Sequence, residues 1–359
     1  MTLTRAETLG NPYASGQLAK RTPWLILAGS LAMSAILFLL LGFADPTAGY
    51  NIPGAVVVGA LIHTVMIYVI SYLIEGSRKA KDRLVTALVS GAFLLALLPL
   101  ISLLSTAVIN GLPRFDLTFF TNSMRNIVGA GGGAVHAIVG TLLMTLTATV
   151  ISVPIGLLTS IYLVEYGRGS LARAITFFVD VMTGIPSIVA GLFAYSIFTL
   201  VFGPGVKLGI AGAIALSVLM IPVVVRSSED MLRLVPNELR EASYALGVPK
   251  WLTVLKIVLP TSMAGITTGV MLAIARVIGE TAPLLVAAGF TNNLNYNLVE
   301  GRMQSLPVFV YTNYVSQGTD PQADIERAWA GALTLILIVM LLNLVARLIA
   351  KYFAPKTGR

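Results

Sequence analysis

Long apolar runs separated by short polar links dominate this chain. Eight of the runs are long enough to cross the hydrocarbon core of a bilayer as helices. These expected spans are Trp24–Phe43, Pro53–Ile74, Leu84–Ile109, Ala137–Val164, Val181–Phe202, Leu208–Val225, Met263–Ala288 and Trp329–Ala346. The pattern predicts an all-α polytopic membrane protein with eight spans.

The positions of the Lys and Arg residues indicate the orientation of these spans. With the N-terminus placed inside, 18 of the 24 Lys and Arg residues fall in inner segments, five in outer segments and one, Arg276, inside a span. Segments with an excess of Lys and Arg stay on the cytoplasmic side of a membrane. We therefore expect both termini in the cytoplasm and the chain in the cell membrane.

Composition supports the membrane assignment and excludes other classes. Hydrophobic residues make up 56% of the 359 residues and charged residues only 11%, whereas soluble domains carry roughly a quarter charged residues. The net charge of +8 follows from the membrane topology and does not indicate a nucleic-acid partner. The chain has no cysteine, which excludes disulfides and thiol chemistry.

The first two spans form a candidate N-terminal extension. Lys20 and Arg21 precede the first span as they would precede the apolar core of a signal peptide, but this apolar run is too long for one. We interpret it as a retained helix. The predicted organisation is a two-span extension at residues 1–83 and a six-helix core at residues 84–359.

The longest cytoplasmic segment, residues 226–261, has the pattern of two short amphipathic helices. Pro236 suits the first turn of a helix, and Gly247 suits its C-terminal end. Between them Leu239, Ala242 and Leu246 share one face, and Glu238, Arg240 and Glu241 lie outside it. Trp251, Val254 and Ile257 form a second apolar stripe that is expected to end at Pro260. Such a segment either packs on its own bundle or serves as a docking surface for a soluble partner.

This segment resembles the EAA loop of ATP-binding cassette (ABC) importer permeases. The family pattern is E-A-A, three residues, G, nine residues and then I-x-L-P, and the chain departs from it only at Ser243, which replaces the second Ala. The resemblance implies that the short helix inserts into a cleft on an ATP-hydrolysing subunit. The expected ATPase-docking residues are Glu241, Ala242, Ser243, Gly247, Ile257, Leu259 and Pro260.

Two further stretches resemble the phosphate-specific ABC permeases, and the A-type subunit in particular. They are Ala275–Leu285, with the sequence ARVIGETAPLL, and Gly184–Val189 together with the following Gly191–Phe193. The resemblance covers roughly Leu84 to Lys351 and implies a six-helix core. The N-terminal hairpin departs from this pattern.

The chain lacks a nucleotide site of its own. No G-x-x-x-x-G-K-[ST] motif occurs in the sequence, so the phosphate-binding loop of ATPases is absent. The glycine-rich run Gly129–Gly133 has no following Lys and is expected outside, where we interpret it as a flexible approach to the fourth span in preference to an anion-binding loop. ATP hydrolysis must then take place on a separate protein, and no cofactor is expected.

Arg276 and Glu280 are two charges in the middle of the seventh expected span. An Arg at the centre of a membrane helix costs roughly 2.5–3.5 kcal/mol. In a continuous helix Glu280 lies one turn beyond Arg276 on the same face. The two side chains then form either a structural ion pair or an anion site, in which the planar guanidinium donates two parallel hydrogen bonds to an oxyanion. Arg276, Glu280 and Thr281 are the expected residues of the substrate pathway.

The sequence thus predicts the permease subunit of an ATP-driven importer that moves inorganic phosphate by alternating access. The expected partners are a second permease subunit, two cytoplasmic ATP-binding subunits, an extracytoplasmic phosphate-binding protein and membrane lipid. A permease for another oxyanion, such as sulfate or molybdate, fits the same charges. An ion-coupled secondary anion transporter fits less well, because no inverted repeat is evident.

Overall fold

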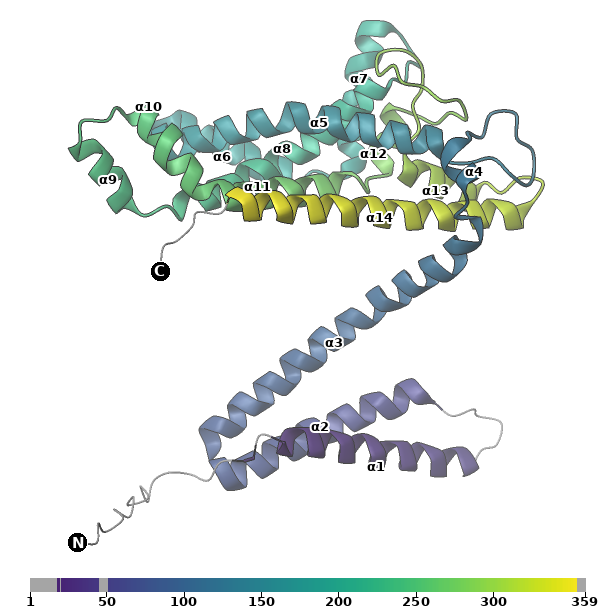
Figure 1. Cartoon of the computed structure of the whole chain (residues 1–359), viewed down its shortest axis with the longest axis vertical. Coiled ribbons are helices and arrows are strands. Elements are labelled where there is room, and N and C mark those ends of the chain that lie inside the picture. Colours follow the sequence, from purple (N-terminus) through teal and green to yellow (C-terminus); the bar gives the residue numbers. More distant parts are fainter. Residues whose placement is uncertain (1–17, 20, 45–50, 354–359) are drawn as a thin grey trace, which may run out of the picture. The chain divides into compact units, whose positions relative to one another are not determined.

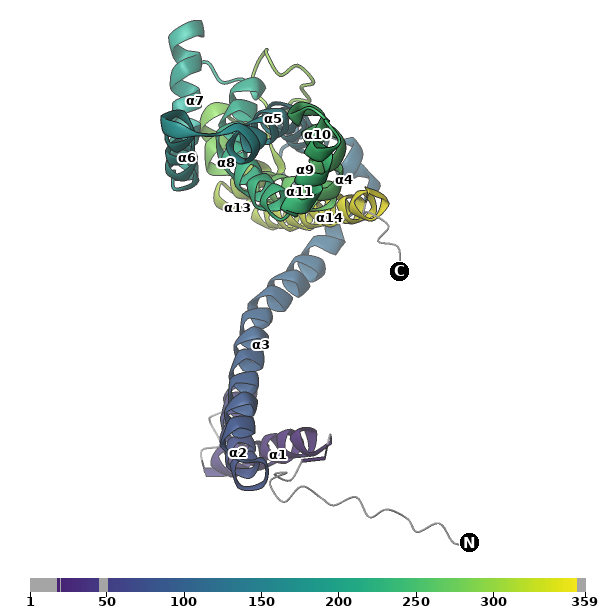
Figure 2. The ribbon, with the colours of Figure 1, turned by 90° about the vertical axis from the view of Figure 1, so that its left-hand side faces the viewer.

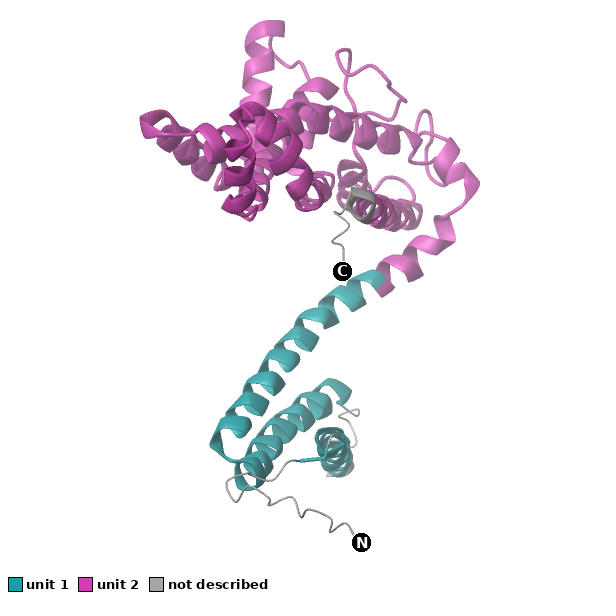
Figure 3. Cartoon of the chain, turned by 60° about the vertical axis from the view of Figure 1, so that its left-hand side comes forward, with its two compact units in different colours: residues 1–104 teal, residues 105–359 magenta. Residues whose placement is uncertain are grey.

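The structure is a computed structural model that describes residues 18–19, 21–44 and 51–353. The regular elements of these described residues are all helices, which confirms the all-α prediction. The chain divides into two compact units, Met1–Leu104 and Ser105–Arg359 (Figure 3). Their boundary falls inside α3 (Ser77–Gly111), and each unit is described by itself.

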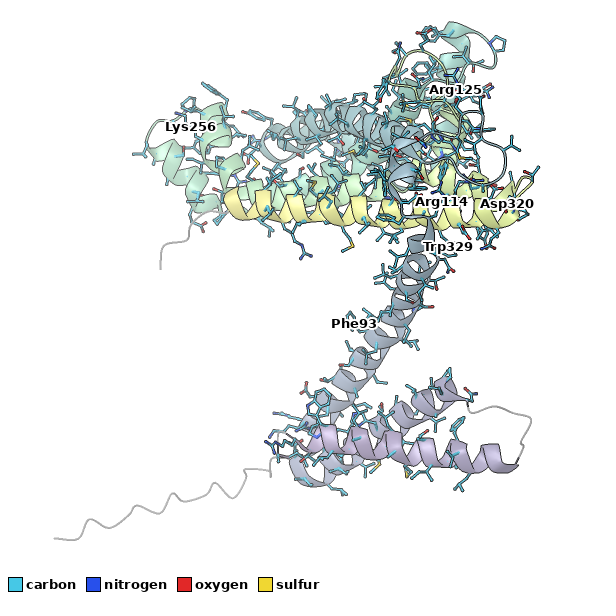
Figure 4. All side chains as sticks on the ribbon, turned by 45° about the vertical axis from the view of Figure 1, so that its right-hand side comes forward. Phe93, Arg114, Arg125, Lys256, Asp320 and Trp329 are labelled. Atoms are coloured by element: carbon cyan, nitrogen blue, oxygen red, sulfur yellow. The ribbon has the colours of Figure 1, made fainter. Side chains whose placement is uncertain are left out.

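The first unit contains an antiparallel helical hairpin made of α1 (Thr22–Ala44) and α2 (Ile52–Glu75). The Ser34 hydroxyl donates to the carbonyl of Ala55 at 2.6 Å across the pair. At the C-terminal end of α2, the buried Glu75 carboxylate accepts hydrogen bonds from Arg83 on α3, at 2.5 and 2.9 Å, and from Ser71. On α3, Phe93 is 63% exposed and projects from a helix with an apolar surface, as expected for contact with lipid (Figure 4).

The second unit is a bundle of long helices connected by short ones (Figures 1 and 2). Its elements after α3 are η1 (Leu112–Arg114), α4 (Leu117–Thr121), α5 (Val135–Ile161), η2 (Tyr162–Tyr166), α6 (Gly169–Thr183), α7 (Ser187–Phe202), α8 (Gly209–Arg233), α9 (Asn237–Ala245), α10 (Lys250–Thr253), η3 (Val254–Val258), α11 (Leu259–Val277), α12 (Ala282–Ala287), α13 (Leu306–Val315) and α14 (Pro321–Phe353). Both η2 and η3 are single π-helical turns.

The core of this bundle forms where α5 and α11 pack against α8. Gly265 and Gly269 lie one turn apart on α11, and a β-carbon at either position would overlap Met231 or Ser227 of α8, at 2.2 and 2.4 Å. Small residues at this spacing let two membrane helices approach closely, which compensates for the weak hydrophobic driving force between helices in lipid. Large apolar side chains such as Leu216, Met220 and Met144 fill the centre of the packing.

The fifth expected span is not one straight helix. The prediction of Val181–Phe202 as a continuous span is wrong, because α6 and α7 meet at a bend of 108° at Gly184, Ile185 and Pro186. Pro186 stands immediately before α7, and the residue before a proline is disfavoured in the helical conformation. In Figures 1 and 2, α7 runs across the direction shared by α5, α11 and α14.

The described part of the chain has seven helices able to cross a membrane, or eight if the bent pair counts as one span. The positions of the neighbouring helices favour counting α6 and α7 together as one span. The helix before the pair, α5, ends beside α9, where Arg240 contacts Glu165. The helix after the pair, α8, begins at the other end of the bundle, beside the loop around Leu298, whose carbonyl accepts a hydrogen bond from the N–H of Ile210. The pair α6–α7 therefore carries the chain from one end of the bundle to the other.

The glycine-rich run before α5 is held by two arginines. The guanidinium of Arg327 on α14 donates to the carbonyls of Gly129 at 2.7 Å and Gly131 at 2.9 Å, and Arg114 donates to that of Gly132 at 2.5 Å. All three glycines have φ between 69° and 97°, a region that other residues adopt only at a cost. The interpretation of this run as a flexible segment leading into the fourth span is therefore wrong, and its carbonyls point toward the two guanidinium groups.

Candidate functional site

The loop predicted to dock an ATPase forms a compact helical hairpin at one end of the second unit. Lys256 marks this end in Figure 4, and Arg114, Arg125 and Asp320 mark the opposite end. The hairpin consists of α9 and α10, which begin after Pro236 and Pro249. Between them Gly247 adopts φ 75° and donates its N–H to the carbonyl of Tyr244, so the predicted end of the first helix is confirmed.

Ser243, the one departure from the family pattern, lies inside the hairpin. Its hydroxyl is 2.8 Å from the hydroxyl of Thr253 on α10, and both residues are buried, with exposures of 3% and 0%. An Ala at position 243 could not make this bond. Ser243 thus joins the two limbs of the hairpin and does not reach the surface.

The apolar face predicted for α9 is exposed in the single chain. Leu239 and Leu246 are 41% and 83% exposed, and Trp251 on α10 is 61% exposed. Glu241, Ala242 and Gly247 are exposed as well. The face therefore does not pack on its own bundle, and this observation favours the alternative of a soluble partner.

Arg240 lies outside the apolar face, as predicted; its side chain is 12% exposed and contacts the Glu165 carboxylate at 2.9 Å. One detail of the loop differs from prediction. The second stripe was expected to end at Pro260, but Lys250–Val277 is one helical run. The π-turn η3 accommodates Pro260, because the N–H of Leu259 bonds to Val254, five residues back. Ile257 and Leu259 are half-buried in this run, and Pro260 is exposed.

The seventh expected span is interrupted at its charged residues. α11 ends at Val277 and α12 begins at Ala282, so Arg276 lies in the last turn of α11 and Glu280 in the break. Pro283 lacks an N–H and cannot bond to the carbonyl of Gly279, which frees backbone polar groups here. The prediction that Glu280 follows Arg276 on one helical face is therefore wrong.

The guanidinium of Arg276 and the carboxylate of Glu280 do not bond to each other or to another described residue. The Arg276 side chain is exposed, and Glu280 and Thr281 are half-buried. Thr281 caps α12 without a side-chain hydrogen bond. A structural ion pair thus does not explain the two charges, whereas an unpaired guanidinium can bind an oxyanion.

The two stretches that resemble phosphate permeases lie against each other. A β-carbon on Gly191 of α7 would stand 2.6 Å from the α-carbon of Pro283, so only glycine permits this approach of α7 to α12. The 108° bend before α7 and the break before α12 consequently occur in neighbouring segments. The sequence gives no indication of this contact, because 81 residues lie between the two stretches.

An all-helical membrane bundle, with charged residues at a helix break and an exposed hairpin at one end, is the arrangement expected of a transport permease. A family model for the "Binding-protein-dependent transport system inner membrane component" matches residues 152–359. The chain is 46% identical over 288 residues to the phosphate transport system permease protein PstA 1 of Mycobacterium tuberculosis, covering 79% of this chain and 91% of that protein. It is 42% identical over 284 residues to the phosphate transport system permease protein PstA of Yersinia pestis, covering 78% and 92%.

The fold is also similar to a chain in the crystal structure of a bacterial alginate ABC transporter in complex with its periplasmic protein. The TM-score is 0.53 at 13% identity, over 78% of this chain and 97% of that chain. The chain therefore belongs to the binding-protein-dependent transport system inner membrane components, and within them to the PstA permeases. It is a transport component of the inner membrane and not an enzyme.

Sequence reasoning assigned no role to three residues that hold the hairpin, namely Lys250 and Thr253 on α10 and Glu165 in η2. Glu165 lies just after the C-terminal end of α5 and bonds to both limbs of the hairpin, through its carboxylate to Arg240 and through its carbonyl to Lys250. Its distance from the loop in sequence conceals these contacts. The signal available was a carboxylate at the end of an apolar run, where a charge costs less than at the centre of a membrane helix.

Proposed function

We propose that this permease moves inorganic phosphate across the cell membrane by alternating access, driven by ATP hydrolysis on partner subunits. The observation that carries this proposal is the 46% identity to a phosphate transport system permease over 79% of the chain. The unpaired guanidinium of Arg276 supports it, because a planar guanidinium suits a tetrahedral oxyanion.

The substrate pathway of this proposal passes the break between α11 and α12. Arg276 binds the passing anion there, Thr281 offers a hydroxyl, and Glu280 accepts a hydrogen bond from a protonated phosphate oxygen. Intramembrane charges that lack a protein partner are typical of transport pathways. The exposed position of Arg276 also leaves room for residues of a second permease subunit on the other side of the anion.

The docking site of this proposal is the exposed face of α9. Glu241 and Ala242 contact the ATP-hydrolysing subunit, and Gly247 ends the helix at the contact. Ser243, Ile257, Leu259 and Pro260 support this face from within the hairpin and from the start of α11. The importer works with further components, including a periplasmic binding protein; we propose two ATP-binding subunits and one second permease subunit.

The topology of this proposal places both termini and the α9 hairpin in the cytoplasm, with residues 1–83 as a two-span extension of the core. The chain has no native cysteine, so single cysteines report sidedness without background. Val128→Cys, at an 81% exposed site, is expected to react with impermeant reagents from outside, and the matched Lys256→Cys only from inside. The reverse pattern contradicts the orientation.

The transported anion is tested with the purified complex in liposomes. ATP is enclosed with the ATP-binding subunits, binding protein is added outside, and uptake of labelled phosphate, sulfate and molybdate is compared. ATP-dependent uptake of phosphate alone is the expected result. Uptake of sulfate or molybdate in its place identifies a different oxyanion permease. Uptake by this chain without ATP-binding subunits indicates a secondary transporter and overturns the proposal.

A further inference from the structure

Glu165 is a buried carboxylate just after the C-terminal end of α5, in the π-turn η2. Its side chain is 5% exposed; its Oε1 accepts a hydrogen bond from Nε of Arg240 on α9 at 3.0 Å and forms an ion pair with Nη2 of the same guanidinium at 2.9 Å. Its main-chain carbonyl accepts from the ammonium of Lys250 on α10. One residue therefore binds both limbs of the docking hairpin.

Arg240 also joins the hairpin to the end of α8. Its Nη1 donates to the carbonyl of Val235 at 2.6 Å, and its Nη2 donates to that of Leu232 at 3.0 Å. Because these carbonyls lie at and just after the C-terminal end of α8, the guanidinium stabilises acceptors that the helix itself leaves unsatisfied. Arg240 thus connects α9 with both α5 and α8.

The hairpin itself is held as one piece. The Ser243–Thr253 bond joins its limbs, and the ammonium of Lys250 lies 5.0 Å from the centre of the Tyr166 ring, in a cation–π contact at the end of η2. A displacement of α9 therefore acts on α10 and on the end of α5 together. We call Glu165, Arg240 and Lys250 the Glu165 junction.

We propose that Glu165 is the positioning residue that transmits movement of the docking hairpin to α5. The inference rests on the proposed function, in which an ATP-hydrolysing subunit moves α9. The partner contacts the exposed apolar face of α9, and the Glu165 junction lies on the buried face. A displacement of α9 by the partner is therefore passed through the junction to α5.

A continuous set of close contacts leads from the junction to the interrupted helix. Along α5, Gly156 is packed against Val224 of α8, where a β-carbon would stand 2.6 Å from the valine side chain. Further along α8, Gly212 is packed in the same way against Ala288 and Leu284 at α12, both within 3.0 Å of such a β-carbon. Close-packed helices at glycine contacts move together, because little room is left for one helix to slide alone.

The test compares Glu165→Gln with Arg233→Ala in the reconstituted complex. Gln keeps the shape of the side chain and its acceptor oxygen but removes the charge that orients Arg240. Arg233 is the matched control, since it lies in the same cytoplasmic segment, is 66% exposed and pairs within its own helix with Glu229. The measurements are complex yield, ATP hydrolysis with and without loaded binding protein, and anion uptake per ATP.

We expect Glu165→Gln to assemble and hydrolyse ATP, with uptake per ATP reduced about tenfold, in the range measured for residues along coupling networks. Glu165→Asp, which retains the charge, is expected to recover part of the coupling, and Arg233→Ala to couple normally. Normal uptake per ATP in Glu165→Gln overturns the proposal. If Glu165→Gln does not assemble, Lys250→Ala is the alternative test. It removes the hydrogen bond from the Lys250 ammonium to the Glu165 carbonyl without leaving a buried charge unpaired. Unchanged uptake per ATP in Lys250→Ala also overturns the proposal.

A second measurement separates this inference from the identity of the anion. Spin labels at Glu238→Cys on α9 and Leu158→Cys on α5, both exposed sites, report the distance between the hairpin and α5 in the assembled complex. A narrow distribution that broadens with Glu165→Gln supports the junction whichever anion is transported. Equal distributions contradict the junction even if phosphate uptake is established.

Discussion

The docking hairpin and the break after α11 differ in whether their polar side chains have partners within the chain. In the hairpin, Ser243 is paired with Thr253, and Arg240 is bonded to Glu165 and to the end of α8. In the break, the side chains of Arg276 and Glu280 have no partner among the described residues. A paired network transmits force because it holds one geometry, whereas unpaired charges remain available to a ligand or another subunit.

The energetic reason for the difference lies in what each region must do. Leaving a buried polar group without a hydrogen bond costs about 1–3 kcal/mol, so a structural element satisfies such groups internally. A transport site must release its ligand and therefore keeps charges that the protein does not satisfy permanently. Each of the following predictions tests one side of this comparison, from the largest expected effect to the smallest.

Arg276→Gln is expected to reduce phosphate uptake at least about 100-fold, or roughly 3 kcal/mol, because truncating one partner of a hydrogen-bonded charge pair has effects of this size. Complex yield is expected to stay normal, since no described residue bonds to the guanidinium. Uptake of labelled phosphate and complex yield are measured together. Arg276→Lys retains the charge without the planar fork and is expected to remain well below wild type.

The double variant Arg276→Gln with Glu280→Gln is the control for this prediction. A structural pair predicts that removing both charges restores uptake. A substrate site predicts that the double variant assembles and stays inactive. Normal uptake by the double variant contradicts the role that we assign to the break.

Gly247→Pro is expected to uncouple the hairpin, at a cost of about 3 kcal/mol or more, because proline cannot adopt positive φ and lacks the donated N–H. Gly247 has φ 75° and donates to Tyr244. Co-purification of ATP-binding subunits and stimulated ATP hydrolysis are measured. Gly247→Asn, which tolerates the left-handed conformation, is the matched variant and is expected to lose much less. Full stimulation in Gly247→Pro argues against docking at this loop.

Gly191→Ala is expected to disturb the contact between α7 and α12 by about 1–3 kcal/mol, the usual cost of overpacking. The added methyl group would meet the backbone of Pro283 at 2.6 Å. Gly279→Ala is the control in the break itself, because a β-carbon there has no neighbour within 4 Å. Thermal stability and uptake are compared; equal behaviour of the two variants shows that this close contact does not constrain α7 and α12.

Ser243→Ala is expected to have the smallest effect, a loss of about 1 kcal/mol in the free energy of unfolding, because one buried hydroxyl pair is broken. The additional change Thr253→Val removes the remaining hydroxyl and is expected to recover part of that loss. Unfolding of the purified complex by denaturant measures both. A Ser243→Ala variant as stable as wild type shows that the bond between the limbs contributes little.

Several features followed from local sequence alone. The apolar runs predict the spans because a helix in lipid must satisfy its own backbone and expose apolar side chains, which is a local requirement. Pro236 and Gly247 likewise mark the limits of α9, since proline and glycine act on the backbone at their own positions. The family pattern located the hairpin for the same reason, because its spacing reflects one short helix.

Tertiary structure decided the features that depend on distant residues. Pro186 and Pro283 act locally at the bend before α7 and at the break after Val277, but the contact of these two segments through Gly191 and Pro283 depends on how two helices meet. Arg240 turns inward because Glu165, 75 residues away, offers a carboxylate there, and Arg327 orients the glycine run from 198 residues beyond Gly129. A periodic pattern shows which face of a helix is apolar. The partner of a charged side chain, however, lies on whichever element packs against that helix, and this packing is established only when the chain folds.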